Sequence, residues 1–139
     1  MRAAEPEVSG HAVNAGVRVH YEVFGSGSTT LLMMGTFPVV DGRQWKGQVP
    51  YLSRHFRVVT VDARGNGGSD RPRGPAAYGD EVCAADALAV ATRQRRVADE
   101  SQKLLADVGE QRLVLEELGG QAVHLERAVR HLALGIEIG

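Results

Sequence analysis

Cysteine is almost absent from this sequence of 139 residues, which contains only Cys83. A single cysteine excludes an internal disulfide and any metal site built from several cysteines. The simplest interpretation of Cys83 is a small, partly buried helix residue. No apolar run approaches the roughly 20 residues that span a bilayer, and the N-terminus through Glu7 is polar, without the apolar core of a signal peptide. We therefore expect a cytoplasmic protein with no membrane partner.

An excess of charge of either sign is also lacking. The 16 basic and 17 acidic residues give a net charge of −1, so we expect no nucleic-acid partner. The densest basic cluster, residues 93–96, is followed directly by Asp99 and Glu100, which argues against a phosphate-binding patch. His124 and His131 share a helix face, but the five histidines do not show the spacing of metal ligands. We expect neither a metal nor a cofactor.

Aromatic residues and proline are absent from the second part of the chain. All seven aromatic residues and all five prolines lie within residues 1–78. Because large aromatic side chains fill much of an α/β core, this change predicts two regions, residues 1–91 and 92–139. The second region is rich in good helix formers. It predicts two or three amphipathic helices, with an apolar stripe that is interrupted at Gly109 and a helix stop at Gly119-Gly120.

The first region shows the pattern of alternating strands and helices. Ala15-Gly16 separates two strand-like segments as a hairpin turn. The second segment alternates apolar and polar residues, and the next strand is apolar throughout, as is typical of burial on both sides. Strand, helix, strand and helix in this order predict right-handed crossovers and a parallel sheet. The expected strands are residues 11–14, 17–24, 29–34 and 56–61, and the expected helices are 44–55, bent or restarted at Pro50, and 80–90.

The most informative run of the chain follows the last expected strand and extends from Asp62 to Pro72. Asp62 can accept hydrogen bonds from backbone N–H groups where the strand ends, and the spaced glycines allow the positive φ angles of a tight path. Ser69 and Asp70 cannot form a catalytic triad by themselves, because a base must reach both. No Lys-Ser or Lys-Thr follows the glycines, so a phosphate-binding loop is not supported. We predict a structural loop whose key residues are Asp62, Arg64, Gly65, Gly67, Ser69 and Asp70.

Residues 17–90 resemble the N-terminal half of the α/β-hydrolase fold family. The resemblance is carried by strands 17–24 and 29–34, by the helix with Trp45 and the run Gln48-Val49-Pro50-Tyr51-Leu52, and by the last strand with its glycine loop. Their order and spacing are similar to those of the family. The resemblance implies an α/β fold, in which a partial hydrolase sheet (a hairpin plus parallel strands with a crossover helix) is followed by a helical C-terminal region. It also implies that the glycine loop shapes the floor of an active site.

The turn after strand 29–34 matches the place where such hydrolases carry His-Gly-x-Pro. This sequence has Met34-Gly35-Thr36-Phe37-Pro38 there, with methionine in place of histidine. By this resemblance Thr36 supplies one backbone N–H of an oxyanion hole, and Gly35 and Phe37 shape the turn. The alternative is a strand-to-helix turn without any chemistry.

The nucleophile elbow G-x-S-x-G of that family is absent from the sequence. No acid or histidine fills the other two places of its triad either. The nearest formal match is Gly135-Ile136-Glu137-Ile138-Gly139, which would place Glu137 in the nucleophile position, although a polar tail is the simpler interpretation. We therefore predict no catalytic residue, expect this chain alone to be inactive, and hypothesise that it is a truncated or rearranged hydrolase.

Two functions are open at the level of the sequence. The first is a hydrolase-like protein, related to enzymes that cleave esters or similar acyl compounds and acting on a small molecule if it is active. The second is a non-catalytic binding or dimerisation module. The family's third strand lies between its fourth and fifth, and the fifth has no match here, so the third would present an unpaired apolar edge. The C-terminal helices could cover that edge or the tail could add a strand to it. The candidate partner is a second copy, bound through Leu31–Met34 or through the C-terminal helices.

Overall fold

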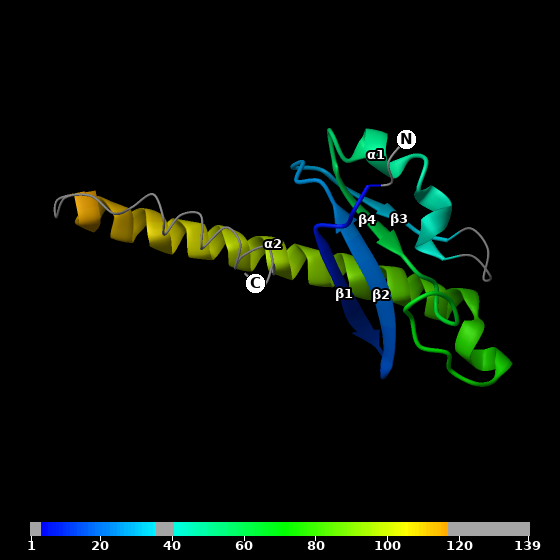
Figure 1. Ribbon diagram of the computed structural model, residues 1–139. Helices are drawn as coiled ribbons and strands as arrows, with labels where there is room; N and C mark the ends of the chain where they lie inside the picture. The colour runs from blue at the N-terminus through cyan, green and yellow to red at the C-terminus, as the bar shows by residue number, and fades with distance from the viewer. Residues whose placement is uncertain (1–3, 36–40, 117–139) are drawn as a thin grey trace. The chain divides into compact units, whose positions relative to one another are not determined.

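The computed structural model describes residues 4–35 and 41–116, with side chains described up to residue 106 (Figure 1). Internal contacts divide the chain into two units, Met1–Arg93 and Gln94–Gly139. All the strands and short helices described lie in the first unit, together with the start of the long last helix. The candidate site described below belongs to this first unit alone.

Strands β1 (Val8–Asn14) and β2 (Val17–Phe24) form an antiparallel hairpin. The turn between them is Ala15-Gly16, with φ angles of 48° and 79°. Positive φ at both central residues matches the right-handed twist of the flanking strands. The hairpin is confirmed, and its first strand begins three residues earlier than the sequence pattern predicts because the pairing continues to Val8 opposite Val23.

Strands β3 (Thr30–Met33) and β4 (Arg57–Val61) complete one sheet with the order β1-β2-β4-β3. Among the strands that the structure describes, only β3 and β4 pair in parallel, while β2 pairs antiparallel with β4. The predicted α/β class is confirmed, with a hairpin and a parallel pair of strands in one mixed sheet. The sheet is mixed because the short hairpin turn reverses the chain before the first crossover.

The segment between β3 and β4 was expected to hold one helix over residues 44–55, and that expectation is wrong. A 3₁₀-helix η1 (Gly42–Trp45) and a one-turn helix α1 (Val49–Leu52) are present instead. Pro50 lies in the first turn of α1, where its missing N–H costs nothing because that group would have no partner in the helix. A new helix therefore starts at Val49, next to Pro50, where the sequence predicted a bend or a restart.

A 3₁₀-helix η2 (Pro75–Tyr78) leads into α2 (Asp80–Glu116), a helix of 37 residues. The change of composition near residues 91–97 does not interrupt it, so the predicted end near residue 90 is wrong. The helix also continues through Gly109. A single glycine costs a helix only about 1 kcal/mol relative to alanine, and no proline follows Pro75. The predicted stop at residues 119–120 lies outside the described residues.

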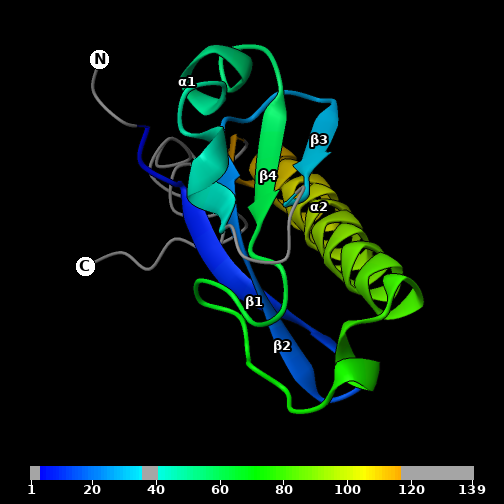
Figure 2. The ribbon, with the colours of Figure 1, turned by 90° about the vertical axis from the view of Figure 1, so that its right-hand side faces the viewer.

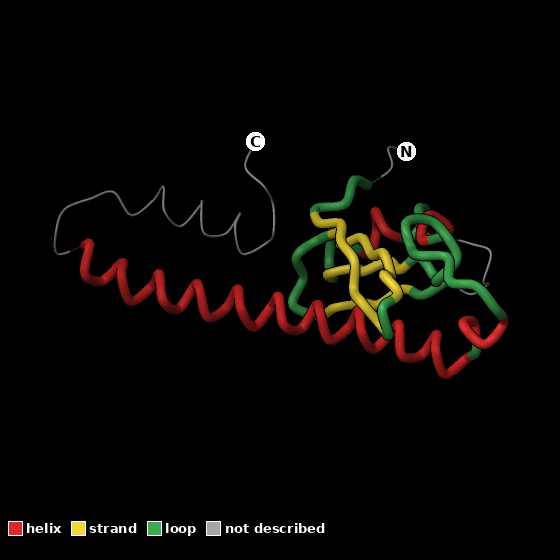
Figure 3. Tube along the Cα trace, turned by 90° about the horizontal axis from the view of Figure 1, so that it is seen from below, coloured by secondary structure: helices red, strands yellow, loops and turns green. Residues whose placement is uncertain are grey.

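Helices pack on both faces of the sheet, as the two-residue period of the strands requires. On one face Tyr21 and Val59 pack with Val90 of α2, and on the other Val58 packs with Val49 of α1. Figure 2 shows α1 and the start of α2 on opposite sides of β4, and Figure 3 shows the strands gathered along the first turns of α2. The large side chains that are fully buried among the described residues are Val19, Val23, Val58, Val59, Val61 and Val90.

No helix in the described ranges is both long enough and apolar enough to cross a membrane. Within the same ranges, no group of three or more His, Cys, Asp or Glu side chains is arranged to hold a metal ion.

Candidate functional site

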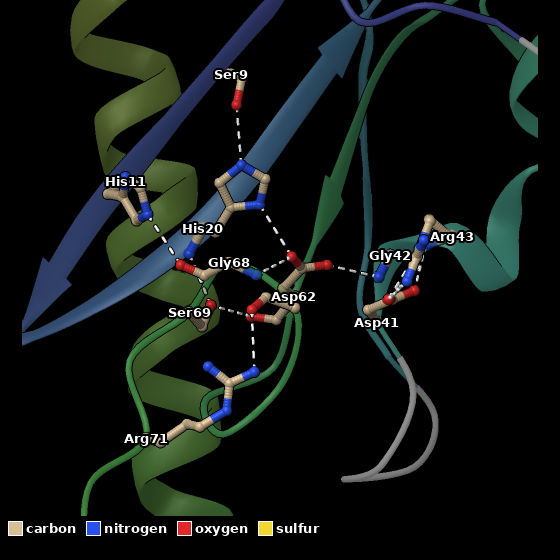
Figure 4. A network of polar contacts seen from close by, with 11 residues as sticks. Ser9, His11, His20, Asp41, Gly42, Arg43, Asp62, Gly68, Ser69 and Arg71 are labelled. Carbon is tan, nitrogen blue, oxygen red and sulfur yellow. Dashed lines mark hydrogen bonds and ion pairs between the residues drawn. The ribbon is translucent and has the colours of Figure 1, made fainter.

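The candidate site is organised around Asp62, directly after β4. Its Oδ1 accepts a hydrogen bond from the N–H of Gly42 at 2.6 Å, and its Oδ2 accepts one from the N–H of Gly68 at 2.9 Å. Oδ2 also lies 2.9 Å from Nδ1 of His20 on β2. One carboxylate thus joins the start of η1, the glycine loop and the hairpin (Figure 4).

Glycine is required in this loop because the chain passes very close to its neighbours. Gly67 has a φ of +49°, and a Cβ at this position would collide with the Asp62 carboxylate. A Cβ on Gly68 would come within 2.8 Å of the His20 ring. Gly65 has a φ of +86°, and a Cβ at this position would lie 3.0 Å from the ring of Tyr78. Backbone N–H groups can therefore approach the carboxylate only where side chains are absent.

Ser69 fastens the loop to the sheet. Its Oγ donates a hydrogen bond to the carbonyl of Asp62 at 2.7 Å and accepts one from the N–H of His20 at 2.8 Å. The residue is 2% exposed. Because backbone groups use both the donor and an acceptor of this hydroxyl, Ser69 holds two strands together and is not presented to a substrate.

Arg64 forms a buried ion pair with Asp86 of α2. Its Nε and Nη2 donate to the two carboxylate oxygens at 2.7 and 2.6 Å, and the residues are 4% and 2% exposed. Nη1 donates to the carbonyl of Ala77 at 2.8 Å, while Nδ2 of Asn14 donates to Asp86 at 2.8 Å. The hydrogen bonds to Asp86 raise the pKa of Arg64. This pair connects the glycine loop with the hairpin turn, η2 and the start of α2.

Asp70 closes the loop against β2. Its carboxylate accepts hydrogen bonds from the backbone N–H and from the guanidinium of Arg18, both at 2.9 Å. Its own N–H donates to the Arg18 carbonyl at 2.9 Å, and its carbonyl accepts from the N–H of Gly65 at 2.8 Å. The side-chain hydrogen bonds from Arg18 hold the pKa of Asp70 below its usual value.

The lowered pKa of Asp70 predicts a pH dependence of stability. The folded protein binds fewer protons at Asp70 than the unfolded chain does, so the contribution of the Asp70–Arg18 pair is fully present above about pH 4, the ordinary aspartate range. It is lost as the pH falls through the lowered pKa. We expect Asp70→Asn to lower the free energy of unfolding, measured with urea, at pH 7, and to make a smaller difference at pH 3. Glu5→Gln, at an exposed position, is the control for removal of one negative charge. A difference that stays constant between pH 7 and pH 3 would contradict the prediction.

The oxyanion-hole assignment falls mostly outside the described residues. Gly35 is half-buried just beyond the end of β3, whereas Thr36 and Phe37 are not among the described residues. Glu137 lies outside them as well. The roles of these residues stay predictions from the sequence.

Two residues of the site, Ser9 and His11, were missed by sequence reasoning, and His20 was placed only on the polar face of its strand. Oγ of Ser9 lies 2.9 Å from Nε2 of His20, and Nε2 of His11 lies 3.0 Å from the carbonyl oxygen of Gly68. The two imidazole rings are 5.2 Å apart. Counting outward from the turn residues Ala15-Gly16 pairs His11 with His20, as observed, so the hairpin register was a usable signal.

A pocket of about 270 Å³ opens on the same face of the sheet as Glu22 and Thr60. Phe24 and Val49 contribute apolar walls, and Arg43 contributes a cation. Gly42, which Asp62 holds through its N–H, also lines this pocket. The pocket and the Asp62 network are therefore continuous through η1.

Known proteins are similar to this chain over part of its length. The profile of a family described as alpha/beta hydrolase fold matches residues 30–125. Epoxide hydrolase 3 of Siraitia grosvenorii is 35% identical over 82 residues, which cover 54% of this chain and 25% of that protein. The soluble epoxide hydrolase of Corynebacterium sp. (strain C12) is 36% identical over 67 residues, which cover 48% of this chain and 23% of that protein. The chain spans about a quarter of the length of these curated relatives.

A solved structure shows the likeness in three dimensions. It is that of Est816, described as an N-acyl homoserine lactone degrading enzyme, which is 29% identical in sequence with a TM-score of 0.53. The superposition covers 61% of this chain and 31% of Est816.

Proposed function

We propose a function for this chain, which belongs to the α/β-hydrolase fold family, on the basis of that membership and of the geometry around Asp62. Residues 1–93 form the scaffold of a hydrolase site for a small molecule with an electrophilic carbon–oxygen bond, such as an ester, a lactone or an epoxide. The relatives described above as epoxide hydrolases and as a lactone-degrading enzyme support this substrate class. The turn Gly35–Phe37, with the N–H of Thr36, is the proposed oxyanion hole.

The observation that carries this proposal is the position of the Asp62 carboxylate. It holds Gly42, in the segment that follows parallel strand β3, and Gly68, in the segment that follows parallel strand β4. Ligands of open α/β sheets bind outside the carboxyl ends of such strands. Asp62 therefore fixes the two segments that would border a bound substrate.

The 139 residues contain no G-x-S-x-G, so the scaffold is proposed to bind but not to turn over such substrates. The test is to incubate the purified chain with ethyl butyrate, γ-butyrolactone and styrene oxide and to measure products by gas chromatography. We expect no product beyond the background reaction.

Binding is tested separately by titrating a lactone into the isotope-labelled protein. We expect saturable shifts of the backbone amide signals of Gly65 and Gly68, and none of Gly16 in the hairpin turn. Multiple turnovers would contradict the expectation that a chain without the G-x-S-x-G elbow does not turn over these substrates, and unchanged loop signals would contradict the proposed binding site.

The second candidate function is that of a dimerisation module, and the position of β3 favours it. Among the described residues β3 pairs only with β4 and lies at the edge of the sheet. Such an edge offers a row of N–H and C=O groups to another strand. Sedimentation velocity over a range of concentrations would show dimers if two copies pair through Leu31–Met34. A concentration-independent monomer would exclude this alternative.

The finer localisation, in the cytoplasm, is also a proposal. It is supported by the presence of a single cysteine, Cys83, since secreted domains of this size often rely on disulfides. Fractionation of the native host with an antibody to this chain would test it, and recovery outside the cytoplasmic fraction would contradict it.

A further inference from the structure

Ser9, His20 and Asp62 form a chain of hydrogen-bonded side chains in an order that supports nucleophilic chemistry. Oγ of Ser9 lies 2.9 Å from Nε2 of His20, and Nδ1 of the same ring lies 2.9 Å from Oδ2 of Asp62. Figure 4 shows the three side chains in line, reaching from β1 across β2 to the end of β4. Nucleophile, base and orienting acid are thus each within hydrogen-bond reach of the next.

The carboxylate determines which nitrogen of His20 carries the proton. Both oxygens of Asp62 accept hydrogen bonds from backbone N–H groups, Oδ1 from Gly42 and Oδ2 from Gly68. Because Oδ2 acts as an acceptor, Nδ1 of His20 is the donor in its contact with this oxygen. Nε2 of the neutral ring then bears the lone pair that accepts the hydroxyl proton of Ser9. The tautomer that a general base needs is therefore set by the backbone of the glycine loop.

The three side chains differ in solvent exposure, as nucleophilic chemistry requires. The side chains of His20 and Asp62 are 17% and 13% exposed, whereas Ser9 is exposed on β1. The ring of His11 lies 5.2 Å from that of His20 and is itself tied to the carbonyl of Gly68. The base and the acid are shielded and held in place, while the hydroxyl is open to a reagent from solution.

We propose that Ser9 is an activated nucleophile that takes an acyl or phosphonyl group from an activated ester or a fluorophosphonate. Its Oγ forms a bond to the electrophilic carbon or phosphorus as its proton passes to Nε2 of His20. The bond to the aryloxide or fluoride leaving group then breaks, and the proton leaves with that group as a phenol or as hydrogen fluoride. Asp62 stays charged throughout and stabilises the imidazolium.

This inference does not depend on the proposed function. Ser9 is the nucleophile here, and neither the turn Gly35–Phe37 nor binding of a lactone near Gly68 is involved. The experiment below measures a single covalent modification of Ser9, whereas the test of the proposed function measures turnover of unactivated substrates. Either result can fail while the other holds.

The experiment is labelling with a fluorophosphonate, followed by intact mass and by peptide mapping. We expect one adduct per folded chain, located on Ser9, and its loss when the chain is unfolded in urea. Ser9→Ala should abolish the adduct, and Ser28→Ala, at another exposed serine, should leave it unchanged. General-base assistance contributes about 100-fold to 10,000-fold to a rate, so His20→Ala should slow labelling at least about 100-fold. Added imidazole should restore part of that rate.

Several outcomes would overturn the inference. One is no adduct on the folded chain, and another is an adduct that persists in Ser9→Ala. Equal labelling of Ser9 and Ser28 in the unmutated protein would show ordinary hydroxyl reactivity, and this measurement needs no variant of His20 to fold. A His20→Ala protein with unchanged circular dichroism and an unchanged labelling rate would remove the base from the proposal.

Discussion

Asp86→Ala is expected to lower the free energy of unfolding by about 3–5 kcal/mol, the usual cost of removing one partner of a buried ion pair. The substitution leaves the guanidinium of Arg64, in a residue only 4% exposed, without its opposite charge. It also removes the nearer of the two acceptors of the Asn14 amide, at 2.8 Å, and leaves the Val82 carbonyl at 3.5 Å. Urea unfolding at pH 7, followed by circular dichroism, measures the loss.

The expected loss of stability arises because Arg64 stays buried without an opposite charge, and not because the ion pair itself is strongly stabilising. Replacing both partners by apolar residues of similar size, Arg64→Met with Asp86→Leu, should therefore recover most of the stability lost in Asp86→Ala, since such replacements are often neutral. Asp70→Ala removes a carboxylate from a pair that is open to solvent and is the matched control, with a much smaller expected effect. If the double variant is as unstable as Asp86→Ala, the ion pair itself stabilises the fold and this explanation is wrong.

Asp62→Ala is expected to cost about 3 kcal/mol or more, because hydrogen bonds to charged groups contribute roughly 1.5–3 kcal/mol each. The carboxylate accepts from Gly42 and Gly68 and contacts His20, and its side chain is 13% exposed. Truncation leaves the two backbone N–H groups without this acceptor. The change in urea midpoint at constant slope measures the effect.

Asp62→Asn is the informative companion variant. Its amide oxygen can still accept one of the two backbone hydrogen bonds, while its NH₂ group faces a donor that the carboxylate had accepted. We expect a loss of stability between those of the unmutated protein and Asp62→Ala. If both variants unfold at the same urea concentration as the unmutated protein, Asp62 does not hold the loop, and the observation behind the proposed function is removed.

Local features of the sequence were sufficient for the strands and their turns. Alternating residues over Val17–Phe24 defined the two faces of β2, and Ala15-Gly16 defined the turn and hence the register of the hairpin. Pro50 marked the restart of the chain at α1. Each of these rests on interactions between residues close in sequence, so the residues themselves carry the information.

Helix boundaries could be predicted less well. The change of composition near residue 92 separates two kinds of sequence, yet α2 continues through it. The amino-acid composition of a segment indicates which surfaces it can pack against. A helix, in contrast, ends where its backbone hydrogen bonds are lost or are replaced by those of a cap. Neither event is required by the residues between Asp80 and Glu116, and Gly109 alone is too small a penalty.

What the sequence by itself determined is the family, the hairpin, the buried strand β4 and the short-range demand for glycine after Asp62. Only the tertiary structure decided which partners meet. Asp62 reaches His20, and Arg64 reaches Asp86, because the order β1-β2-β4 places the end of β4 beside the hairpin and the first turns of α2 pack on the sheet. The physical reason is that a period of two or 3.6 residues assigns a side chain to a face, whereas its partner depends on strand order, which is set by packing of the whole sheet.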